Sequence, residues 1–453
     1  MKISILSYGT RGDIQPYLAL ALALAEAGHQ VRLAAPAMFA EMVEQYVPQN
    51  DPQRSVDFFP LPGDPTQLMR SAGSLSPLTM LLPGALRQGL TVVNFIGPVI
   101  PQLIRAAREA VEGADLVIHT LLTAVIGHQI ARSLGVHDVS ALVFPVFLPT
   151  GQFPNPLFSP WPDWIRIFGK HAAAYGPRYN YLTHREFNRV FWYGSRMTIH
   201  ALRRGHPDIP LLEEWPFESC DGIAPICPAA TAEIIYGISR HALPYPSDWT
   251  GQNKMMGYWF LDAPPDWHPP PGLERFLDSG SPPVFIGFGS VISKQANRLT
   301  QAAIDALRRT GQRGVLLQGW GGLKPEALPE WVYPVEQVPY DWLFPRITAA
   351  VHHGGMGTTA AVLRAGISQV VMPFTFDQPF WGRQVQHLGV GPAPITHGQR
   401  SAQSMADAID KMLNDTGMRQ SAAHLGETIR AENGLQNAVR AILQYSSNKK
   451  TQL

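Results

Sequence analysis

The strongest constraint on the fold is a pattern that occurs twice in the chain: an apolar strand followed by a glycine-rich turn and a helix. The first copy comprises a strand at residues 2–7, a turn at 8–13 and a helical segment at 14–27. The second copy begins with a strand and turn at 283–290 and continues into a helical segment at 296–309. Because strands that alternate with helices build parallel sheets covered on both faces, the sequence predicts an α/β fold with two similar domains.

Composition narrows the class of protein further. The chain has 453 residues, of which 36 are Lys or Arg and 35 are Asp or Glu, so the formal net charge is +1. A net charge this close to zero gives no indication of the basic surface that nucleic-acid binding needs. We therefore expect no nucleic-acid partner. The two cysteines, Cys220 and Cys227, are too few for a disulfide framework or a zinc site, so we expect both to be reduced.

The sequence also bears on where the protein works. The first strand starts at residue 2, with no cationic and apolar leader before it. No run of apolar residues is long enough to cross a bilayer. We therefore expect a cytoplasmic protein, with at most a peripheral contact to a membrane.

Domain boundaries follow from a proline-rich stretch in the middle of the chain. Five prolines fall between residues 264 and 271, and such a segment favours an extended connection over a helix. The predicted parts are an N-terminal domain at 1–240, a linker at 241–272, a C-terminal domain at 273–435, and a last helix with a polar tail at 436–453.

The segment with the most chemical content is 351–359, Val-His-His-Gly-Gly-Met-Gly-Thr-Thr, which ends one strand and begins a helix. Its small residues let backbone N–H groups approach an anion, and the helix N-terminus adds partial positive charge. His353 can donate to a phosphate oxygen, and Thr358 can donate its hydroxyl. The pattern fits a phosphate-binding turn, and it also fits a plain glycine-rich turn that a histidine caps.

A second strand end follows at 371–381, where Asp377 and Gln378 begin another helix. Ligands of open α/β sheets lie at the carboxyl ends of strands, so both motifs fall on one edge of the predicted sheet. A carboxylate beside an amide suits hydrogen bonds to neighbouring sugar hydroxyls. Asp377 is also suited to capping the helix, and the two roles are compatible.

These segments resemble the donor-binding signature of family 1 nucleotide-sugar glycosyltransferases. The resemblance rests on the run 352–366, which opens with His-His-Gly-Gly, and on 373–382 with its Asp-Gln pair. The opening turn and helix start at 9–16 and the segments 257–260 and 283–290 also fit. Within this family the chain is most similar to the branch of sterol glucosyltransferases and antibiotic glycosyltransferases.

The resemblance implies the GT-B fold, in which two Rossmann-like domains face each other across a cleft. In that fold the C-terminal domain binds the nucleotide sugar, the N-terminal domain binds the acceptor, and the last helix crosses back onto the N-terminal domain. The reaction of the family inverts the anomeric centre in one displacement and uses no metal. The sequence agrees, since it contains neither Asp-x-Asp nor His-Glu-x-x-His. We expect no cofactor, with the UDP-sugar as co-substrate.

The resemblance also assigns roles to individual residues of the donor site. The implied diphosphate contacts come from the two glycine-rich turns and are Gly289, Ser290, His353, Gly355, Gly357 and Thr358. Asp377 and Gln378 are the implied sugar contacts. Val338 and Trp320 are the implied nucleoside contacts.

An inverting displacement needs a base that removes the proton of the acceptor hydroxyl. Asp13 follows the first glycine turn, as an aspartate does in the sterol and antibiotic branch, and the resemblance makes it the catalytic base. From the residues alone, Asp13 is also suited to capping the helix or to an ion pair with Arg11. We expect Arg11 to shape the turn or the mouth of the acceptor site.

Two stretches of the N-terminal half carry almost no charge. Residues 139–162 carry none, and 71–104 carry only Arg87. We interpret them as walls of an apolar acceptor site, with Phe144, Phe147 and Trp161 as lining residues. Buried core beneath long loops is the alternative, and a weak contact with a membrane surface is a third interpretation.

The leading hypothesis is therefore a UDP-glycosyltransferase that moves a hexose, in the first instance glucose from UDP-glucose, onto a hydroxyl of a sterol, triterpenoid or other lipid-like alcohol. An antibiotic or polyketide glycosyltransferase that uses a TDP-sugar is the first alternative. A non-catalytic nucleotide-sugar-binding protein and a UDP-sugar 2-epimerase are the others. The sequence leaves open the acceptor, the sugar, the nucleobase and the oligomeric state.

Overall fold

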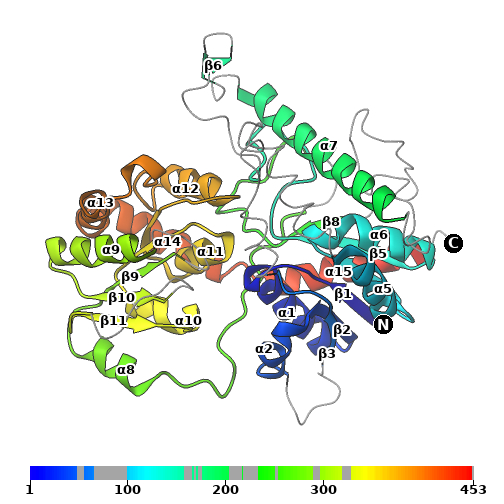
Figure 1. The fold of residues 1–453 in the computed structure, drawn as a ribbon, viewed down its shortest axis with the longest axis horizontal. Helices are drawn as coiled ribbons and strands as arrows, with labels where there is room; N and C mark the ends of the chain where they lie inside the picture. Colours follow the sequence, from blue (N-terminus) through cyan, green and yellow to red (C-terminus); the bar gives the residue numbers. More distant parts are fainter. Residues whose placement is uncertain are drawn as a thin grey trace. The chain divides into compact units, whose positions relative to one another are not determined.

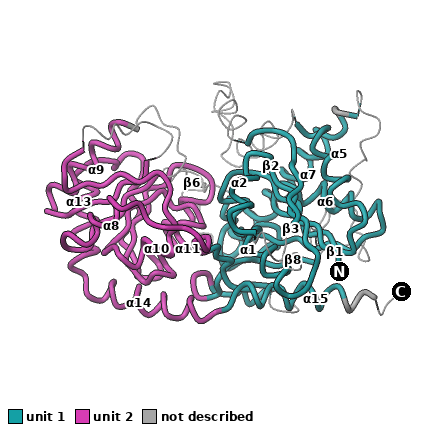
Figure 2. Tube along the Cα trace, turned by 90° about the horizontal axis from the view of Figure 1, so that it is seen from below, with its two compact units in different colours: residues 1–240, 244–261, 433–453 teal, residues 241–243, 262–432 magenta. Residues whose placement is uncertain are grey.

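The chain divides into two compact units (Figure 2). Unit 1 contains Met1–Arg240, Pro244–Leu261 and Asn433–Leu453, and unit 2 contains His241–Leu243 and Asp262–Glu432. The computed structural model describes residues 1–47, 56–65, 99–157, 166–167, 170–171, 176–203, 217, 233–249, 254–288, 296–318 and 328–450.

Unit 1 is built on a six-stranded parallel sheet with the order β3-β2-β1-β4-β5-β8 (Figure 1). The strands are β1 Lys2–Leu6, β2 Gln30–Pro36, β3 Val56–Leu61, β4 Leu116–His119, β5 His137–Leu142 and β8 Glu233–Tyr236, and a separate antiparallel pair is formed by β6 Arg166–Ile167 and β7 Lys170–His171. The helices are α1 Arg11–Glu26, α2 Ala40–Glu44, α5 Ile100–Val111, α6 Ala124–Ser133, α7 Gly176–Leu202 and α15 Gly434–Lys450, with 3-10 turns η1 Ala37–Phe39 and η5 Leu121–Thr123.

Unit 2 is built on a five-stranded parallel sheet with the order β11-β10-β9-β12-β13. The strands are β9 Val284–Gly287, β10 Gly314–Leu317, β11 Val332–Val335, β12 Ala349–His352 and β13 Ser368–Val371. The helices are α8 Pro271–Asp278, α9 Ala296–Thr310, α10 Tyr340–Leu343, α11 Met356–Ala365, α12 Gln378–His387, α13 Ala402–Asn414 and α14 Thr416–Arg430, with 3-10 turns η9 Phe344–Arg346 and η10 His397–Gln399.

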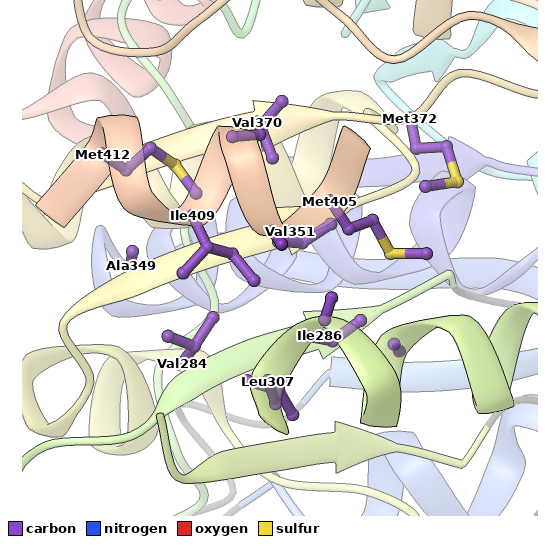
Figure 3. Close-up of a cluster of buried hydrophobic side chains, with 14 of the residues drawn as sticks. Val284, Ile286, Leu307, Ala349, Val351, Val370, Met372, Met405, Ile409 and Met412 are labelled. Atoms are coloured by element: carbon purple, nitrogen blue, oxygen red, sulfur yellow. The ribbon is translucent and has the colours of Figure 1, made fainter. Parts of the chain in front are cut away.

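The strands of unit 2 alternate between two apolar cores, one on each face of the sheet. Val284 and Ile286 of β9 pack with residues of α9 and α13, such as Leu307 and Ile409, in the first core (Figure 3). Phe285, between them, belongs to the second core. A period of two follows from the pleat of a strand, whose side chains point alternately to the two faces. Burial on both faces explains why β9 reads as an unbroken apolar run.

The predicted α/β architecture with two Rossmann-like sheets is confirmed, because both sheets are parallel and are joined through helices. One helix start differs from the expectation. The helical pattern indicated a start at residue 14, whereas α1 begins at Arg11. Thr10 and Asp13 explain the difference, since the backbone N–H and the hydroxyl of Thr10 donate to Asp13 Oδ2 at 2.8 and 3.0 Å and so close the first turn.

The segment expected as a linker is divided between the two units. Its stretch 254–261 packs in unit 1, where Met255 pairs with Tyr236 of β8 and the Trp259 ring lies edge-on to Tyr17 of α1 at 5.9 Å. The next stretch, Asp262–Glu432, belongs to unit 2.

The last helix, α15, belongs to unit 1, where it contacts α1 and β8. Asn437 Nδ2 donates to the Met256 carbonyl at 3.1 Å. Gly434 lies so close to Tyr258 that a Cβ there would stand 2.3 Å from its carbonyl oxygen. Residues 446–450, expected as part of a polar tail, continue the helix.

The longest helix in the described part of the chain is α7, with 27 residues. It carries four arginines and a single acidic residue, Glu186. Within the described ranges, no helix combines the length and the apolar character needed to cross a bilayer.

Replacing Ile442 with alanine should destabilise unit 1, because Ile442 of α15 is fully buried. Deletion of buried methylene groups of this size costs about 2–5 kcal/mol. Urea unfolding followed by circular dichroism should show an earlier transition. Arg440→Ala, exposed on the same helix, is the control and should change the free energy of unfolding by less than about 0.5 kcal/mol. Equal effects of the two substitutions would contradict a stabilising role for α15.

Candidate active site

In unit 2, β9 and β12 lie side by side at the point where the strand order reverses, since β10 follows on one side and β13 on the other. Gly287 at the end of β9 pairs with His352 at the end of β12. The backbone N–H of His353 donates to the Gly287 carbonyl at 3.3 Å. In open α/β sheets, ligands bind outside the carboxyl ends of the strands at such a reversal. The ends of the two strands that lead into the predicted diphosphate-binding turns therefore lie side by side, while residues 289–295 of the first turn lie outside the described residues.

His352, the first histidine of the turn, holds the turn against the sheet. Its ring is fully buried, Nδ1 accepts from the Gly354 N–H at 3.0 Å, and Nε2 lies 2.7 Å from Gln369 Oε1 on β13. Because Nδ1 accepts, the ring proton is assigned to Nε2, which donates to Gln369. Burial lowers the pKa of His352 to about 3, so the ring is neutral.

Two glycines make the turn geometrically feasible. Gly354 has a φ of +89°, and a Cβ there would stand 2.3 Å from Val371 Cγ1, so a larger residue is excluded on two grounds. Gly355 is the N-cap of α11, and a Cβ there would stand 2.6 Å from Nε2 of His353. The glycine at 355 thus lets the His353 ring lie against the backbone of the turn.

The N-terminus of α11 is open. Gly355 has no side chain to cap it, and the backbone hydrogen bonding of the helix begins with Thr359 N–H donating to the Gly355 carbonyl at 3.0 Å. The N–H groups of the preceding turn have no acceptor within the helix. Gly357 is exposed, with open space where a Cβ would stand, and Thr358 is half-buried. Such a helix end carries partial positive charge and binds anions.

His353 lies beside this helix end in its neutral form. Burial lowers the pKa of His353 to about 4, so the ring is uncharged near pH 7. Its Nδ1 is buried and has no hydrogen-bond partner among the described residues. A neutral imidazole both donates and accepts one hydrogen bond, and a ligand at this turn would supply the missing partner.

A second turn, at 373–377, follows β13 and leads into α12. Gln378 Oε1 accepts from the N–H groups of Phe374 and Thr375 at 2.7 and 3.0 Å. Phe376 has a φ of +53°, a left-handed conformation that is strained for a residue with a Cβ. Asp377 is 6% exposed, and its carboxylate does not cap the helix. Because the turn occupies Gln378 Oε1, the amide group of Gln378 that is left for a ligand is the donor Nε2.

Arg400 contacts the same turn, and sequence reasoning missed it. Its guanidinium lies 4.1 Å from the centre of the Phe374 ring and donates to the Pro373 carbonyl. Burial lowers its pKa, although an arginine remains charged at any physiological pH. Its Nε is buried without a hydrogen-bond partner in the described part of the chain. Arg400 lies after η10, far along the chain from the Asp-Gln motif, so no local pattern connects it to the site.

Asp13 occupies the matching position in unit 1, where β1 and β4 meet at the reversal of the strand order. Its Oδ2 accepts the two hydrogen bonds from Thr10, and its backbone carbonyl accepts from Ser7 Oγ at 2.7 Å. Gly9 has a φ of +142°, and a Cβ there would stand 2.4 Å from Asp13 Oδ2. The carboxylate is therefore held directly over the glycine turn.

The capping alternative for Asp13 is found in a different form, because Thr10 is the N-cap of α1 and Asp13, three residues on, completes the capping box. Arg11 is exposed and forms no ion pair with Asp13 or with any other described residue. Burial raises the pKa of Asp13. A higher pKa makes the carboxylate a stronger base. The second carboxylate oxygen of Asp13, Oδ1, accepts no hydrogen bond from the described residues. The capping interaction therefore occupies only one of the two oxygens. The catalytic role of Asp13 stays a prediction.

A buried polar cluster lies beneath α6 and is formed by His119, His128 and Asp138. His119 Nε2 and His128 Nδ1 lie 2.8 and 2.7 Å from the same oxygen, Asp138 Oδ2. Burial alone would raise the pKa of Asp138, but the two histidine hydrogen bonds outweigh it and hold the pKa below its usual range. Histidine and aspartate are common metal ligands. However, the ligand atoms around a tetrahedral zinc stand roughly 3.3 Å apart, whereas the two histidine nitrogens lie only 2.8 and 2.7 Å from Asp138 Oδ2. The cluster is a hydrogen-bonded network joining β4, β5 and α6.

The remaining predicted site residues are placed as follows. Val338 lies between β11 and α10, half-buried against the second core of unit 2. Phe144 follows β5 and is half-buried, whereas Phe147 is fully buried and stacks on Phe217 at 4.4 Å. Phe147 therefore lies inside an aromatic core, and its acceptor role stays a prediction. The predictions for Trp161, Gly289, Ser290 and Trp320, and for Cys220 and Cys227, lie outside the described residues.

Solved structures show which class of fold this is. The calicheamicin glycosyltransferase CalG4 matches with a TM-score of 0.64 at 17% identity over 98% of each chain. The glycosyltransferase VinC, solved with dTDP, matches with a TM-score of 0.63 at 16% identity over 99% of this chain and 100% of its own. The fold is the GT-B fold of glycosyltransferases, with two Rossmann-like domains.

Sequence comparison identifies the family. The glycosyltransferase family 28 N-terminal domain matches residues 3–96, and the erythromycin biosynthesis protein CIII-like C-terminal domain matches residues 322–444. Two sterol 3-beta-glucosyltransferases of Arabidopsis thaliana are 34% and 33% identical over 99% and 98% of this chain, and one of Candida albicans is 32% identical over 99%. The chain spans 66% and 68% of the plant proteins and 28% of the fungal one. It belongs to the glycosyltransferase family that contains the sterol 3-beta-glucosyltransferases, as its sequence motifs predicted.

Substituting Gly354 with alanine should destabilise unit 2, since the side chain would be strained at a φ of +89° and would clash with Val371. We expect a loss of roughly 1–3 kcal/mol in the free energy of unfolding, measured in urea. Gly357→Ala is the matched control, because its Cβ enters open space and the substitution removes a glycine from the first turn of α11. That variant should be neutral or more stable by about 0.5–1 kcal/mol. The reverse order of stability would mean that the turn is not as tight as described.

The buried histidines should make unit 2 less stable in acid. Burial lowers the pKa of His352 to about 3 and that of His353 to about 4, whereas an unfolded chain has the ordinary value of about 6.5. The folded state thus favours the neutral rings. Their contribution is complete above about pH 6.5 and declines toward pH 4, with a slope of up to about 1.4 kcal/mol per pH unit for each histidine.

Urea unfolding at a series of pH values measures that slope. His352→Gln and His353→Gln should each flatten it below about pH 6.5. His397→Gln, at an exposed position of η10, should leave it unchanged. A slope that is the same in all three variants and the parent chain would refute the assignment.

Proposed function

We propose that the chain transfers a hexose, in the first instance glucose from UDP-glucose, to the hydroxyl of a sterol or similar apolar alcohol, with inversion at the anomeric carbon. The observation that carries the proposal is the arrangement at the ends of β9 and β12. There an open helix N-terminus and a neutral histidine with an unsatisfied buried nitrogen meet on a turn that only glycine can form. Membership of the sterol 3-beta-glucosyltransferase family supports it.

The diphosphate of the donor would bind at the N-terminus of α11. As the bond to the sugar breaks, the departing diphosphate gains negative charge, and fixed N–H donors stabilise that charge at little cost in reorganisation. His353, the backbone of Gly355 and Gly357, and the hydroxyl of Thr358 would supply those donors. Arg400 adds a fixed positive charge at the neighbouring turn.

The sugar would bind at the turn that precedes α12. Asp377 would accept hydrogen bonds from its hydroxyls, and Gln378 Nε2 would donate one. Asp377 is the single carboxylate of the turns at 353–358 and 373–378. Divalent cations in such sites need several oxygen ligands. We therefore propose transfer without a metal, with charge met by hydrogen bonds and the helix end.

Unit 1 would supply the base and the acceptor site. The acceptor oxygen forms a bond to the anomeric carbon while the bond from that carbon to the diphosphate oxygen breaks, and the electron pair leaves with the nucleotide. Asp13 takes the acceptor proton. Its Oδ1 is the oxygen proposed to do so, because that atom accepts no hydrogen bond from a described residue. Arg11 and the half-buried Phe144 are proposed near the acceptor.

A second candidate is a transferase that uses a TDP-sugar and an antibiotic-type acceptor. It is favoured by the match of residues 322–444 to the erythromycin biosynthesis protein CIII-like domain and by the likeness to VinC, which was solved with dTDP. The proposal for a sterol is preferred because the sterol glucosyltransferases match over nearly the whole chain at about twice the identity of the antibiotic enzymes.

A donor-by-acceptor assay tests both candidates. UDP-glucose and TDP-glucose are each offered with a sterol in detergent and with a macrolide aglycone, and products are identified by mass. We expect a sterol glucoside from UDP-glucose. Asp13→Asn should cut turnover by about 10² or more while leaving UDP affinity near that of the parent chain. Thr10→Ala, which removes only the capping hydroxyl, should cost about 1 kcal/mol in stability and far less in turnover.

Two results would overturn the proposal. If no hexose reaches any alcohol under conditions where UDP binds, the chain is a nucleotide-sugar-binding protein. If Asp13→Asn weakens UDP affinity and stability as much as turnover, Asp13 is structural and another base is required.

A further inference from the structure

Helix α7 lies along the margin of unit 1 (Figure 1) and is anchored by one face whose side chains are buried. His184, Asn188 and Trp192 on that face are fully buried. Asn188 Nδ2 donates to the Phe147 carbonyl at 2.9 Å, and the His184 ring nitrogens lie 3.2 Å from the carbonyls of Val146 and Phe153. These contacts fix the rotation of the helix about its axis, and with it the identity of the side chains that face outward.

The outward face of α7 is unusually apolar. Of the five large apolar side chains with high exposure among the described residues, four belong to this helix. Leu182 and Tyr193 are each 48% exposed, and Met197 is 73% exposed. From Leu182 to Met197 the helix rises by about 22 Å, so these side chains form a row and not a single compact patch. Exposure of a row of apolar side chains to water is unfavourable, and such a row marks a surface that binds a partner or a membrane.

A row of arginines runs beside the apolar row. Arg178, Arg185, Arg189 and Arg196 are separated by seven, four and seven positions, a spacing that keeps them in one line along the helix. Glu186, the one acidic residue of α7, pairs with Arg189 at 2.9 Å. Arg178 and Arg196 are exposed and form no ion pair with a described residue. Arg185 and Arg189 are half-buried, so the exposed positive charge of the outward face comes from Arg178 near one end of the helix and Arg196 near the other.

We propose that the outward face of α7, defined by Leu182, Tyr193, Met197, Arg178 and Arg196, binds the surface of a phospholipid bilayer that contains anionic lipids. An apolar row beside a cationic row is the pattern of a helix that lies in the plane of a membrane interface. Arginine suits this position because its apolar stem extends the buried area while the guanidinium reaches the phosphates. A protein partner with one compact apolar patch would fit a row of this length less well.

This surface would bring the transferase to the place where its apolar acceptor is dissolved. Binding to lipid needs neither the sugar donor nor turnover. Only the suggested purpose of that binding, access to the acceptor, rests on the proposed function. The two can therefore fail separately.

Flotation with vesicles tests the proposal. The full chain is mixed with vesicles of phosphatidylcholine alone, or of phosphatidylcholine with phosphatidylserine, and the bound fraction is measured after centrifugation. We expect binding to the anionic vesicles that weakens with added salt. Arg178→Gln and Arg196→Gln should each weaken binding about fivefold. Met197→Asp should weaken it by about tenfold or more through the loss of apolar contact.

Matched controls keep the test specific to α7. Met38→Asp changes an exposed methionine of unit 1 that is 45% exposed, and Arg308→Gln changes an exposed arginine of α9 in unit 2. Both should bind vesicles as the parent chain does. Circular dichroism and urea unfolding verify that every variant is folded, as expected for changes at exposed positions.

Three outcomes would overturn the proposal: no vesicle binding by the parent chain, equal loss in the controls, or α7 variants that bind vesicles normally. If instead the α7 variants change the sedimentation of the protein alone, the face binds a second copy of the chain. Transfer to a detergent-dispersed sterol is measured on the same variants. A chain that binds vesicles but transfers nothing refutes the proposed function and leaves the membrane surface standing.

Discussion

The candidate donor site of unit 2 depends on the parallel pairing of β9 with β12. That pairing brings Gly287 beside His352 and lets the next residue, His353, bond back to Gly287. From there the chain must turn within two glycines before α11 begins. The buried side chain of His352 reinforces the turn by linking it to Gln369 of β13. The open helix end is thus held by the interior of the sheet, and a ligand binding there would not have to order the turn first.

The same architecture carries different chemistry in the two units. At the strand reversal of unit 2 the groups are neutral donors and a helix end, which suit an anion. At the reversal of unit 1 the group is a carboxylate whose pKa is raised by burial and whose position is set by Thr10 and Gly9. The raised pKa of Asp13 and the lowered pKa of His353 have one cause, the removal of water, which disfavours the charged form of each group.

Much of this arrangement could be predicted from the sequence, because strand periods and glycine turns are local signals. The positions of His353, Gly355 and Asp13 relative to their own strands followed from such signals. Arg400 could not be predicted, since its contact with the turn at Pro373 depends on a packing between segments with no shared motif. The left-handed conformation of Phe376 could not be predicted either, because no glycine marks it, and it lies in a turn whose Phe374 and Thr375 N–H groups donate to Gln378 Oε1. The split of the proline-rich segment between the units required tertiary contacts such as Trp259 with Tyr17.

Helix α15 has a consequence for how the protein is made. Unit 1 is completed by Asn433–Leu453, which the ribosome synthesises only after the whole of Asp262–Glu432. At ordinary elongation rates of about 5–20 residues per second this interval is on the order of 10–30 s. During it, the apolar surface of α1 and β8 that α15 will cover stands bare on the nascent chain. Unit 1 therefore begins to emerge before unit 2 and is completed after it.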